Sequence, residues 1–164
     1  MESDWSTCKE PLVTVLLPVY NAESTVAFTL ERLRTQTYTN VEYIVINDGS
    51  TDNTLAVIKQ AIKGDNRFRL IDRENRGLIY SLNEGLRLAQ GKYIVREDAD
   101  DFSEPERIDR QVSYMEHNPN IVVAGSQTRT FGAGNSVSSY PTTPDDCKAR
   151  LLLSPPVSHP AVII

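Results

Sequence analysis

Short apolar runs alternate along most of this chain with longer segments in which apolar residues recur at every third or fourth position. The runs are rich in β-branched residues and short enough for buried strands. They are LVTVLL at 12–17, VEYIVI at 41–46, FRLI at 68–71, KYIV at 92–95 and IVVAG at 121–125. The longer segments predict helices at 23–36, 54–63, 78–90 and 103–117.

Local signals define the ends of these elements. Pro18 closes the first strand, Asn21 is a candidate cap for the helix that follows, and Gly91 ends the third helix. Ser103 and Glu106 form a capping box at the start of the fourth helix. Strands that alternate with helices predict an α/β fold of three layers, α/β/α, in which helices cover both faces of a mostly parallel sheet.

The pattern weakens after residue 126. The stretch TRTFGAGNSVSSYPTTP at 128–144 predicts a hairpin or a loop, and DDCKARLLL at 145–153 predicts a short helix. We divide the chain into an N-terminal extension at 1–10 and one domain at 11–164. Because the chain stops inside the apolar run HPAVII, we expect this domain to be truncated at its C-terminus.

Composition and charge indicate a soluble globular protein. The 164 residues are 40% hydrophobic and 24% charged, and the net charge is -5. The chain as a whole offers no basic surface, so we expect it to bind neither nucleic acid nor anionic lipid. Cys8 and Cys147 belong to no CxxC or metal-ligand spacing. The chain has neither a secretory signal nor an apolar segment of membrane length, which indicates a cytoplasmic location.

Three predicted strands end in polar sequences, and ligands of parallel sheets bind beyond these carboxyl ends. The sequences are PVYNAE at 18–23, NDGSTDNT at 47–54 and REDADD at 96–101. Asp48 could accept hydrogen bonds from a base imide or a ribose hydroxyl, or could only cap its turn. Pro18, Tyr20 and Glu23 would suit a nucleoside, although their segment could equally be a plain connection.

Charged residues at two further points suggest a diphosphate and a cation. Arg76 stands before a predicted helix, where amides and a guanidinium would both attract a diphosphate, unless its side chain is only solvated. Four carboxylates crowd residues 97–101, and like charges that close repel. Asp98 and Asp100 are two residues apart in an extended segment, a pattern typical of ligands to Mg²⁺ or Mn²⁺. A solvated acidic loop is the alternative.

Taken together and in this order, PVYNAE, NDGSTDNT, NRG, and DADD followed by SEPERIDRQ resemble the motifs of the family-two glycosyltransferases. These are inverting enzymes with the A-type nucleotide-diphospho-sugar transferase fold, many of them from bacterial polysaccharide and cell-envelope biosynthesis. The resemblance covers roughly residues 12–164. It implies transfer of a sugar from a nucleotide diphosphate donor to a hydroxyl of a glycan or lipid-linked acceptor.

The resemblance also implies a donor, a cofactor and a location. A UDP-sugar is the first expectation for the donor, with GDP- and dTDP-sugars as alternatives, and Mg²⁺ or Mn²⁺ is the expected cofactor. Peripheral association with the inner face of the membrane is compatible with the family. The sugar, the acceptor and the oligomeric state are left open.

Roles for single residues follow from the same resemblance. Asp98 and Asp100 match the metal-binding DxD pair of the family, with Asp100 as the direct ligand that acts in catalysis through the metal. His159 lies in SHPAV, which is similar to a segment near the sugar and acceptor site of related bacterial enzymes, or is a structural loop histidine. The expected nucleotide-sugar-binding residues are Pro18, Tyr20, Glu23, Asp48, Arg76, Asp98 and His159.

The chain departs from the family pattern at the general base. In the family this carboxylate lies in a later acidic motif, and we expect it outside this chain, because Asp145 and Asp146 stand in a different context. A non-catalytic nucleotide-sugar-binding module is therefore the alternative function. A sugar nucleotidyltransferase or a dinucleotide-dependent dehydrogenase would need a glycine-rich loop after the first strand, where this chain has PVYNAE.

Overall fold

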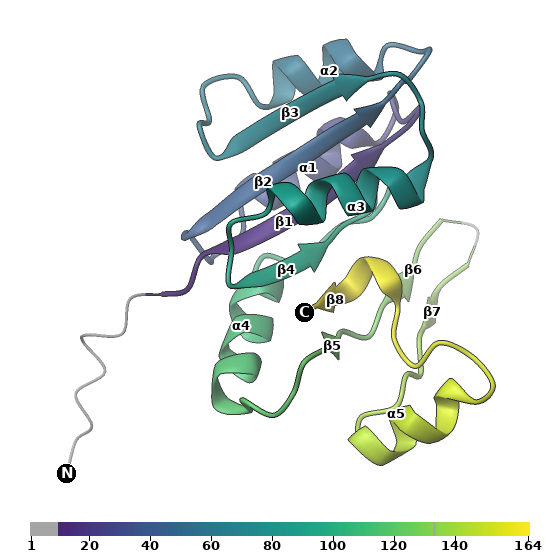
Figure 1. Ribbon diagram of the computed structural model, residues 1–164. Helices are drawn as coiled ribbons and strands as arrows, with labels where there is room; N and C mark the ends of the chain where they lie inside the picture. The colour runs from purple at the N-terminus through teal and green to yellow at the C-terminus, as the bar shows by residue number, and fades with distance from the viewer. Residues whose placement is uncertain (1–9, 133) are drawn as a thin grey trace.

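The computed structural model describes residues 10–132 and 134–164 (Figure 1). Cys8 and most of the predicted N-terminal extension lie outside the described residues. The strands are β1 Val13–Val19, β2 Val41–Asp48, β3 Phe68–Arg73, β4 Tyr93–Arg96, β5 Ala124–Gly125, β6 Arg129–Thr130, β7 Ser136–Val137 and β8 Val162–Ile163. The helices are α1 Val26–Arg34, α2 Thr54–Ala61, α3 Leu78–Leu88, α4 Arg107–His117, α5 Pro144–Leu151 and the 3₁₀ helix η1 His159–Ala161.

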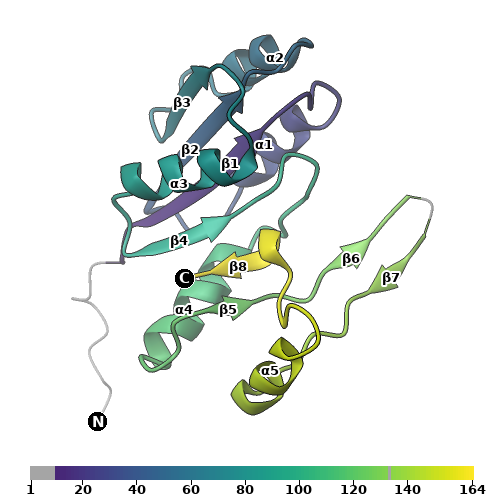
Figure 2. The same ribbon diagram turned by 45° about the vertical axis from the view of Figure 1, so that its right-hand side comes forward.

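Four neighbouring strands of the six-stranded sheet are parallel. The strand order is β3-β2-β1-β4-β8-β5, and the first four strands run in one direction, whereas β8 is antiparallel to both of its neighbours. The carboxyl ends of parallel strands meet at one edge of a sheet. The segments that follow β1, β2, β3 and β4 therefore gather at the same edge, which we call the carboxyl edge (Figures 1 and 2).

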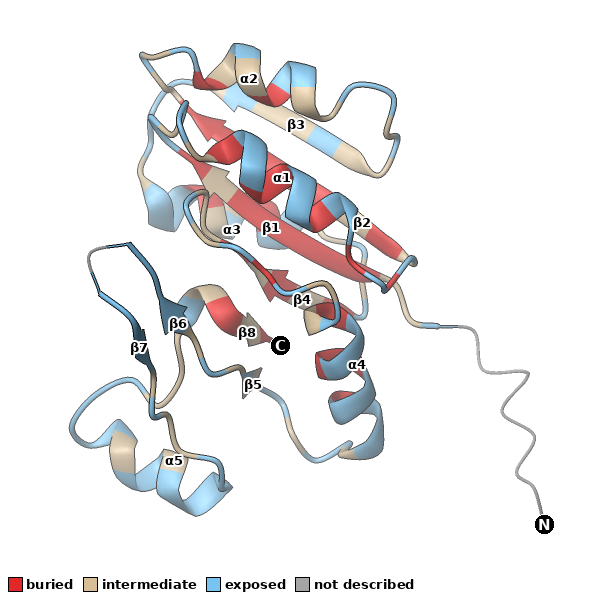
Figure 3. Cartoon of the chain, turned by 180° about the vertical axis from the view of Figure 1, so that it is seen from behind, coloured by how far each residue is buried: buried red, intermediate tan, exposed pale blue. Residues whose placement is uncertain are grey.

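Alternation along β1 places the core on both faces of the sheet. Val15 and Leu17 belong to the larger buried cluster, which α1, α2 and α4 complete, whereas Leu16 lies on the opposite face under α3. Gly85 brings α3 close to the sheet, since a Cβ there would lie 2.9 Å from Cδ2 of Leu16. Figure 3 shows α1 and α2 on the rear face, and Figure 1 shows α3 on the front. The predicted three-layer fold is confirmed.

The predicted cap of α1 is wrong. The helix starts at Val26 with Thr25 as its N-cap, and no side chain bonds to the first turn. Asn21 lies further upstream in a left-handed conformation (φ 48°), and its Oδ1 accepts a hydrogen bond of 2.8 Å from the amide of Thr51. Oδ1 of Asn21 therefore accepts a hydrogen bond from the loop after β2, whereas the sequence pattern predicts that it accepts one from the first turn of α1.

The predicted capping box of α4 is also wrong. Glu106 is the N-cap residue and makes no side-chain capping bond. The hydroxyl of Ser103 instead donates to Oε2 of Glu97, at 2.6 Å. The hydroxyl thus donates a charge-assisted hydrogen bond to a buried carboxylate, whereas a capping box would need its oxygen as the acceptor for an amide of the first helical turn.

Pro18 does not close β1 as predicted, because the strand continues to Val19 with Pro18 opposite Ile46. The pairing of β1 with β4 already ends at Leu16, so the missing N–H of Pro18 leaves no ladder bond unmade on that side. The apolar run at 121–125 forms only the two-residue strand β5, whereas β6 and β7 form a hairpin, the first of the two alternatives predicted for residues 128–144. No helix in the described part of the chain is long and apolar enough to cross a membrane.

Gly49, in the turn after β2, has both a conformation and neighbours that exclude a side chain. Its φ is 70°, and a Cβ would lie 2.4 Å from the backbone nitrogen of Asn75. We expect Gly49→Ala to lower the free energy of unfolding by about 2–5 kcal/mol, because the left-handed conformation costs about 1–2 kcal/mol and overpacking about 1–3 kcal/mol more. Urea denaturation followed by circular dichroism measures this loss.

Gly64→Ala is the matched control. Gly64 also has a positive φ, of 80°, but a Cβ there would meet no atom within 4 Å. Only the conformational cost of about 1–2 kcal/mol is expected for it. Equal losses in the two variants would contradict the clash with Asn75.

Candidate functional site

Two loops at the carboxyl edge hold each other in place. The amide of Asn53 donates to Oε2 of Glu23 at 2.8 Å, and the amide of Glu23 donates to Oδ2 of Asp52 at 3.2 Å. The amide of Ala22 donates to the hydroxyl of Thr54 at 2.8 Å. The loops after β1 and β2 therefore form one unit. One carboxylate oxygen of Glu23 supports the start of α2, and its contact with a nucleoside stays a prediction.

Asp48 is a buried carboxylate at the end of β2, with 4% of its surface exposed. Its Oδ1 accepts hydrogen bonds from the amide of Arg76, at 2.8 Å, and from the guanidinium of Arg73. Burial opposes ionisation, but the donors outweigh it and lower the pKa of Asp48 below its ordinary value. Asp48 is therefore ionised at neutral pH.

Arg73 is a site residue that sequence reasoning misses. Besides Asp48 it contacts α3, donating to Oε2 of Glu84 at 2.7 Å and to the hydroxyl of Ser81 at 2.8 Å. The sequence pattern ends this strand at Ile71, whereas β3 continues to Arg73. A strand drawn two residues longer would have placed this arginine beside Asp48 at the carboxyl edge.

The backbone of Arg76, not its side chain, contacts Asp48. Its guanidinium lies on the exposed surface, where Nη1 donates to the hydroxyl of Tyr80 at 2.6 Å and the guanidinium carbon is 4.9 Å from the centre of the ring. Gly77, with φ 84°, separates Arg76 from the first turn of α3. The predicted position at a helix N-terminus is confirmed, and the contact with a diphosphate stays a prediction.

The carboxylates of the acidic segment, residues 97–101, lie in unlike environments. Asp98 pairs with Arg96, whose Nη2 is 2.9 Å from Oδ1. Asp101 is half-buried, and this burial, with the charges of Asp100 and Asp98, raises its pKa. Asp100 is exposed and makes no hydrogen bond or ion pair with another described residue.

Glu97 points into the core, with 1% of its surface exposed. It forms an ion pair with Arg107 of α4 and accepts a hydrogen bond from Ser103. Burial raises the pKa of Glu97 to about 7, although the guanidinium acts in the opposite direction. Arg107 also donates to the backbone carbonyls of Arg96 and Pro160, both at 2.9 Å, and so connects the end of β4 to η1.

The acidic segment suits a hard divalent cation. Asp100 offers a carboxylate without a partner among the described residues, and Asp98, two residues before it, offers a second one. Carboxylate oxygens are the ligands that Mg²⁺ and Mn²⁺ prefer. Within residues 10–132 and 134–164, no group of three or more His, Cys, Asp and Glu side chains is arranged to hold a metal. An ion here would therefore take at most two protein carboxylates and complete its shell with water or phosphate.

The other predicted residues lie around the same edge. Pro18 is half-buried in β1, and Tyr20 follows that strand with 53% of its surface exposed. His159 is exposed on η1, which packs against β4. The structure thus brings Pro18, Tyr20, Asp48 and the acidic segment to one edge, and holds the segment of His159 against the strand that precedes the acidic segment.

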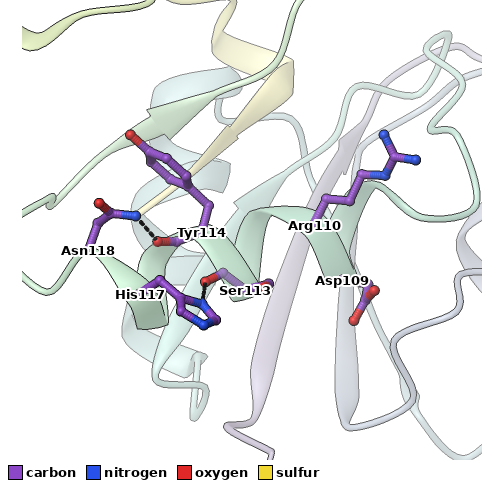
Figure 4. Close-up of a pocket in the computed structure, with 6 residues that line it drawn as sticks. All are labelled: Asp109, Arg110, Ser113, Tyr114, His117 and Asn118. Carbon is purple, nitrogen blue, oxygen red and sulfur yellow. Dashed lines mark hydrogen bonds between the residues drawn. The ribbon is translucent and has the colours of Figure 1, made fainter.

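Two surface hollows lie on helices away from these residues. One, of about 400 Å³, follows the outer side of α4, where His117 and Asn118 bond back to carbonyls of their own helix (Figure 4). The other, of about 700 Å³, lies between α1 and α2. Neither hollow is lined by a predicted site residue, so the candidate site is defined by the polar strand ends.

One protein-family model and several curated relatives match this chain. The sequence model of the family described as Glycosyl transferase family 2 matches residues 14–154. An uncharacterized glycosyltransferase of Haemophilus influenzae is 45% identical over 117 residues, which cover 71% of this chain and 36% of that protein. Glycosyltransferase GlyG of Streptococcus pneumoniae is 30% identical over 143 residues, 87% of this chain and 48% of that protein. The matched part thus spans less than half of each relative.

Comparison with solved structures agrees with the fold. The mannosyltransferase PcManGT from Pyrobaculum calidifontis, in complex with GDP-Man and Mn2+, superposes with a TM-score of 0.65 and 26% sequence identity. The superposition covers 70% of this chain and 35% of the mannosyltransferase. The predicted A-type transferase fold is confirmed.

The buried pair of Glu97 and Arg107 predicts a large effect on stability. Arg107→Met keeps much of the side-chain volume but leaves Glu97 buried without its cation, so we expect the free energy of unfolding to fall by about 3–5 kcal/mol where this carboxyl is ionised in the wild type, above its folded-state pKa of about 7. Burial holds the pKa of this carboxyl above its ordinary value of 4.5. Because this pKa is raised, the neutral form of Glu97 adds to the free energy of unfolding. This contribution is fully present below pH 4.5 and is lost as pH rises through the folded-state pKa of about 7. The deficit of Arg107→Met should therefore shrink as pH falls from about 9 to about 5, through the folded-state pKa of about 7, measured by urea denaturation.

Arg110→Met is the matched control on the same helix. It removes the exposed ion pair of Arg110 with Glu106. Exposed pairs contribute about 0–1 kcal/mol, so little change is expected at either pH. Identical denaturation midpoints for the two variants would rule out a special role of the buried pair.

Proposed function

This chain belongs to glycosyl transferase family 2, and we propose that it forms the donor-binding part of an inverting, metal-assisted glycosyltransferase. The enzyme would transfer a sugar from a nucleoside diphosphate to a hydroxyl of a glycan or lipid-linked acceptor. A cytoplasmic enzyme at the inner face of the membrane would meet both substrates there.

The observation that carries the proposal is the unequal pairing of the carboxylates at the carboxyl edge. Asp48, Glu97 and Asp98 each face an arginine of the chain. Asp100 is exposed and has no such partner among the described residues. Crowded like charges favour the approach of a cation. The lack of a partner for Asp100 among the described residues therefore supports the proposal that a metal ion binds there together with the diphosphate of the donor.

We assign Asp100 as the direct ligand of Mg²⁺ or Mn²⁺, with Asp98 as a second ligand or a ribose contact. The mannosyltransferase of similar fold forms its complex with GDP-Man and Mn2+, which supports this choice. When bound, such an ion stabilises negative charge on a departing diphosphate. The pair formed by Asp98 with Arg96 would hold the acidic segment in place for the incoming ligand.

Inversion requires attack from the side opposite the diphosphate. The acceptor hydroxyl oxygen would bond to the anomeric carbon while the bond from that carbon to the diphosphate oxygen breaks, and the nucleoside diphosphate would leave with the electron pair. A general base must take the hydroxyl proton. We assign that base to a later acidic motif of the intact enzyme, and the greater length of the relatives supports this assignment.

We propose that the nucleoside lies on the α3 side of the carboxyl edge. Alternation along the strands puts Pro18 and Asp48 on the same face as α3. Asp48 would accept a hydrogen bond from the imide of the base, Tyr20 would lie along the nucleoside with Glu23 behind it, and Arg76 would stand near the diphosphate. His159 would lie on the side of the sugar and acceptor, because Arg107 holds η1 to the end of β4.

A non-catalytic nucleotide-sugar-binding module is the second candidate. It is favoured by one observation: Asp48, Glu97 and Asp98 each form an ion pair with an arginine of the chain, so none of the three stands free to take a proton from an acceptor hydroxyl. Nucleotide binding without sugar transfer in the intact enzyme would distinguish this module from a transferase.

Calorimetric titration with UDP, GDP and dTDP, each with and without Mn²⁺, tests the donor site and its base. We expect one nucleotide to bind at least about tenfold more tightly with the ion. Asp100→Asn should abolish that gain, because it removes the charge that faces the metal. Asp145→Asn, which removes an exposed carboxylate of α5, should leave the gain unchanged. An undiminished gain in Asp100→Asn, or the absence of nucleotide binding, would contradict the proposal.

Asp48→Asn tests the base contact separately. The variant keeps the shape of the side chain but loses the charged acceptor, and hydrogen bonds to charged groups contribute about 1.5–3 kcal/mol. We expect nucleotide affinity to fall about tenfold or more, both with and without Mn²⁺. Asp72→Asn makes the same change one strand away, where Oδ1 accepts a hydrogen bond from Asn47. Similar affinities for Asp48→Asn and Asp72→Asn would remove Asp48 from the nucleotide site.

A further inference from the structure

Three phenylalanine rings from separate segments gather beside the acidic segment. Phe28 of α1, Phe102 and Phe131 form this cluster, which we call the phenylalanine platform. The rings of Phe28 and Phe102 meet edge to face with centres 4.3 Å apart, and those of Phe102 and Phe131 stack at 4.8 Å with an angle of 22° between planes. The platform joins α1, the acidic loop and the hairpin of β6 and β7.

The platform is not part of the closed core. Phe28, Phe102 and Phe131 are 42%, 37% and 59% exposed, whereas the large side chains of the core are nearly inaccessible to solvent. The guanidinium of Arg32 lies 5.0 Å from the centre of the Phe28 ring. Exposed rings at one place on a soluble domain mark a contact surface more often than isolated apolar residues do.

The fold ties the platform to the proposed metal ligands. Phe102 follows Asp101 directly in the chain, two residues after Asp100. Thr29, next to Phe28 on α1, donates its hydroxyl to the carbonyls of Ala99 and Asp101, at 3.0 and 3.1 Å. The platform and the acidic segment therefore keep a fixed relation to each other.

The chemistry of this surface selects a neutral ligand with both apolar and hydroxyl-bearing sides. The carboxylates of Asp100 and Asp101 next to the rings disfavour anionic lipid and nucleic acid. Flat ring faces offer area but no hydrogen bonds. A pyranose ring combines a face of C–H groups, which can lie on an aromatic ring, with a rim of hydroxyls that can donate to carboxylates.

We propose that the phenylalanine platform is an acceptor subsite, on which a neutral pyranose ring of the acceptor glycan stacks. This assignment rests on the proposed function, since a sugar acceptor must reach the donor held at Asp100. Phe102 and Phe131 cover one face of each other, so the pyranose lies on an outer face of this stack, and the adjoining carboxylates accept hydrogen bonds from the rim of the sugar. A donor nucleotide alone gives no reason for exposed rings on the α1 side of the carboxyl edge.

Binding of neutral oligosaccharides to this chain tests the platform. The probes are the tetrasaccharides of β-linked glucose, β-linked N-acetylglucosamine, β-linked galactose and α-linked mannose, titrated by saturation-transfer NMR. Phe102→Leu and Phe131→Leu keep apolar packing but remove the flat face. We expect at least one probe to bind the wild type, and its dissociation constant to rise about tenfold or more in both variants. Tyr114→Leu, at the exposed ring of α4, should leave binding unchanged.

Nucleotide titration with Mn²⁺ on the same samples separates the two proposals and shows that the variants are folded. Intact nucleotide binding in the leucine variants together with lost saccharide binding supports the platform. Intact nucleotide binding with no saccharide binding to the wild type, or equal saccharide binding in wild type and variants, overturns it. A change of sedimentation coefficient in Phe131→Leu would also overturn it, because the rings would then join two copies of the chain. Absent nucleotide binding counts against the proposed function itself.

Discussion

Four parallel strands that end at one edge of a sheet bring the carboxylates that follow them into one region. Repulsion between these charges, together with partial burial, raises the free energy of the ionised forms. The fold offsets most of this energy with one guanidinium group for each of three carboxylates. The pairs are Asp48 with Arg73, Glu97 with Arg107 and Asp98 with Arg96. The charge that remains is concentrated at Asp100 and Asp101, where a cation would have the largest effect.

The arginines also join the elements that surround the site. Arg73 reaches Ser81 on α3, and Arg107 reaches the carbonyl of Pro160 on η1. An ion pair of this kind therefore does more than cancel a charge, because its loss would also release a helix from the strand end. The position of the acidic segment depends on these contacts, since the segment follows β4 directly in the chain. Electrostatic compensation and placement of the site are thus properties of the same side chains.

The order of strands and helices follows from the sequence because periodicity reports directly which face of an element is buried. The strand-end position of Asp48 follows in the same way. Arg73 and Asp48 are 25 residues apart, and no local pattern pairs them. Asn21 and Ser103 look like caps within their own segments, but the fold brings each of them a different partner. Local patterns fail at these residues because a polar side chain bonds to whichever group the tertiary structure places nearest.

The motif residues differ in how much of their bonding capacity the protein itself uses. Glu23 and Asn21 hold two loops together, so their presence in a motif is explained before any ligand is considered. Tyr20 and Asp100 are exposed and make no such contact with the described residues. A ligand that touches both must bridge two strand ends that the loops and ion pairs already hold still. Such a ligand would bind more tightly because the loops are already fixed, so little conformational entropy of the protein is lost on binding. A nucleotide with its diphosphate is long enough and polar enough to bridge the two strand ends.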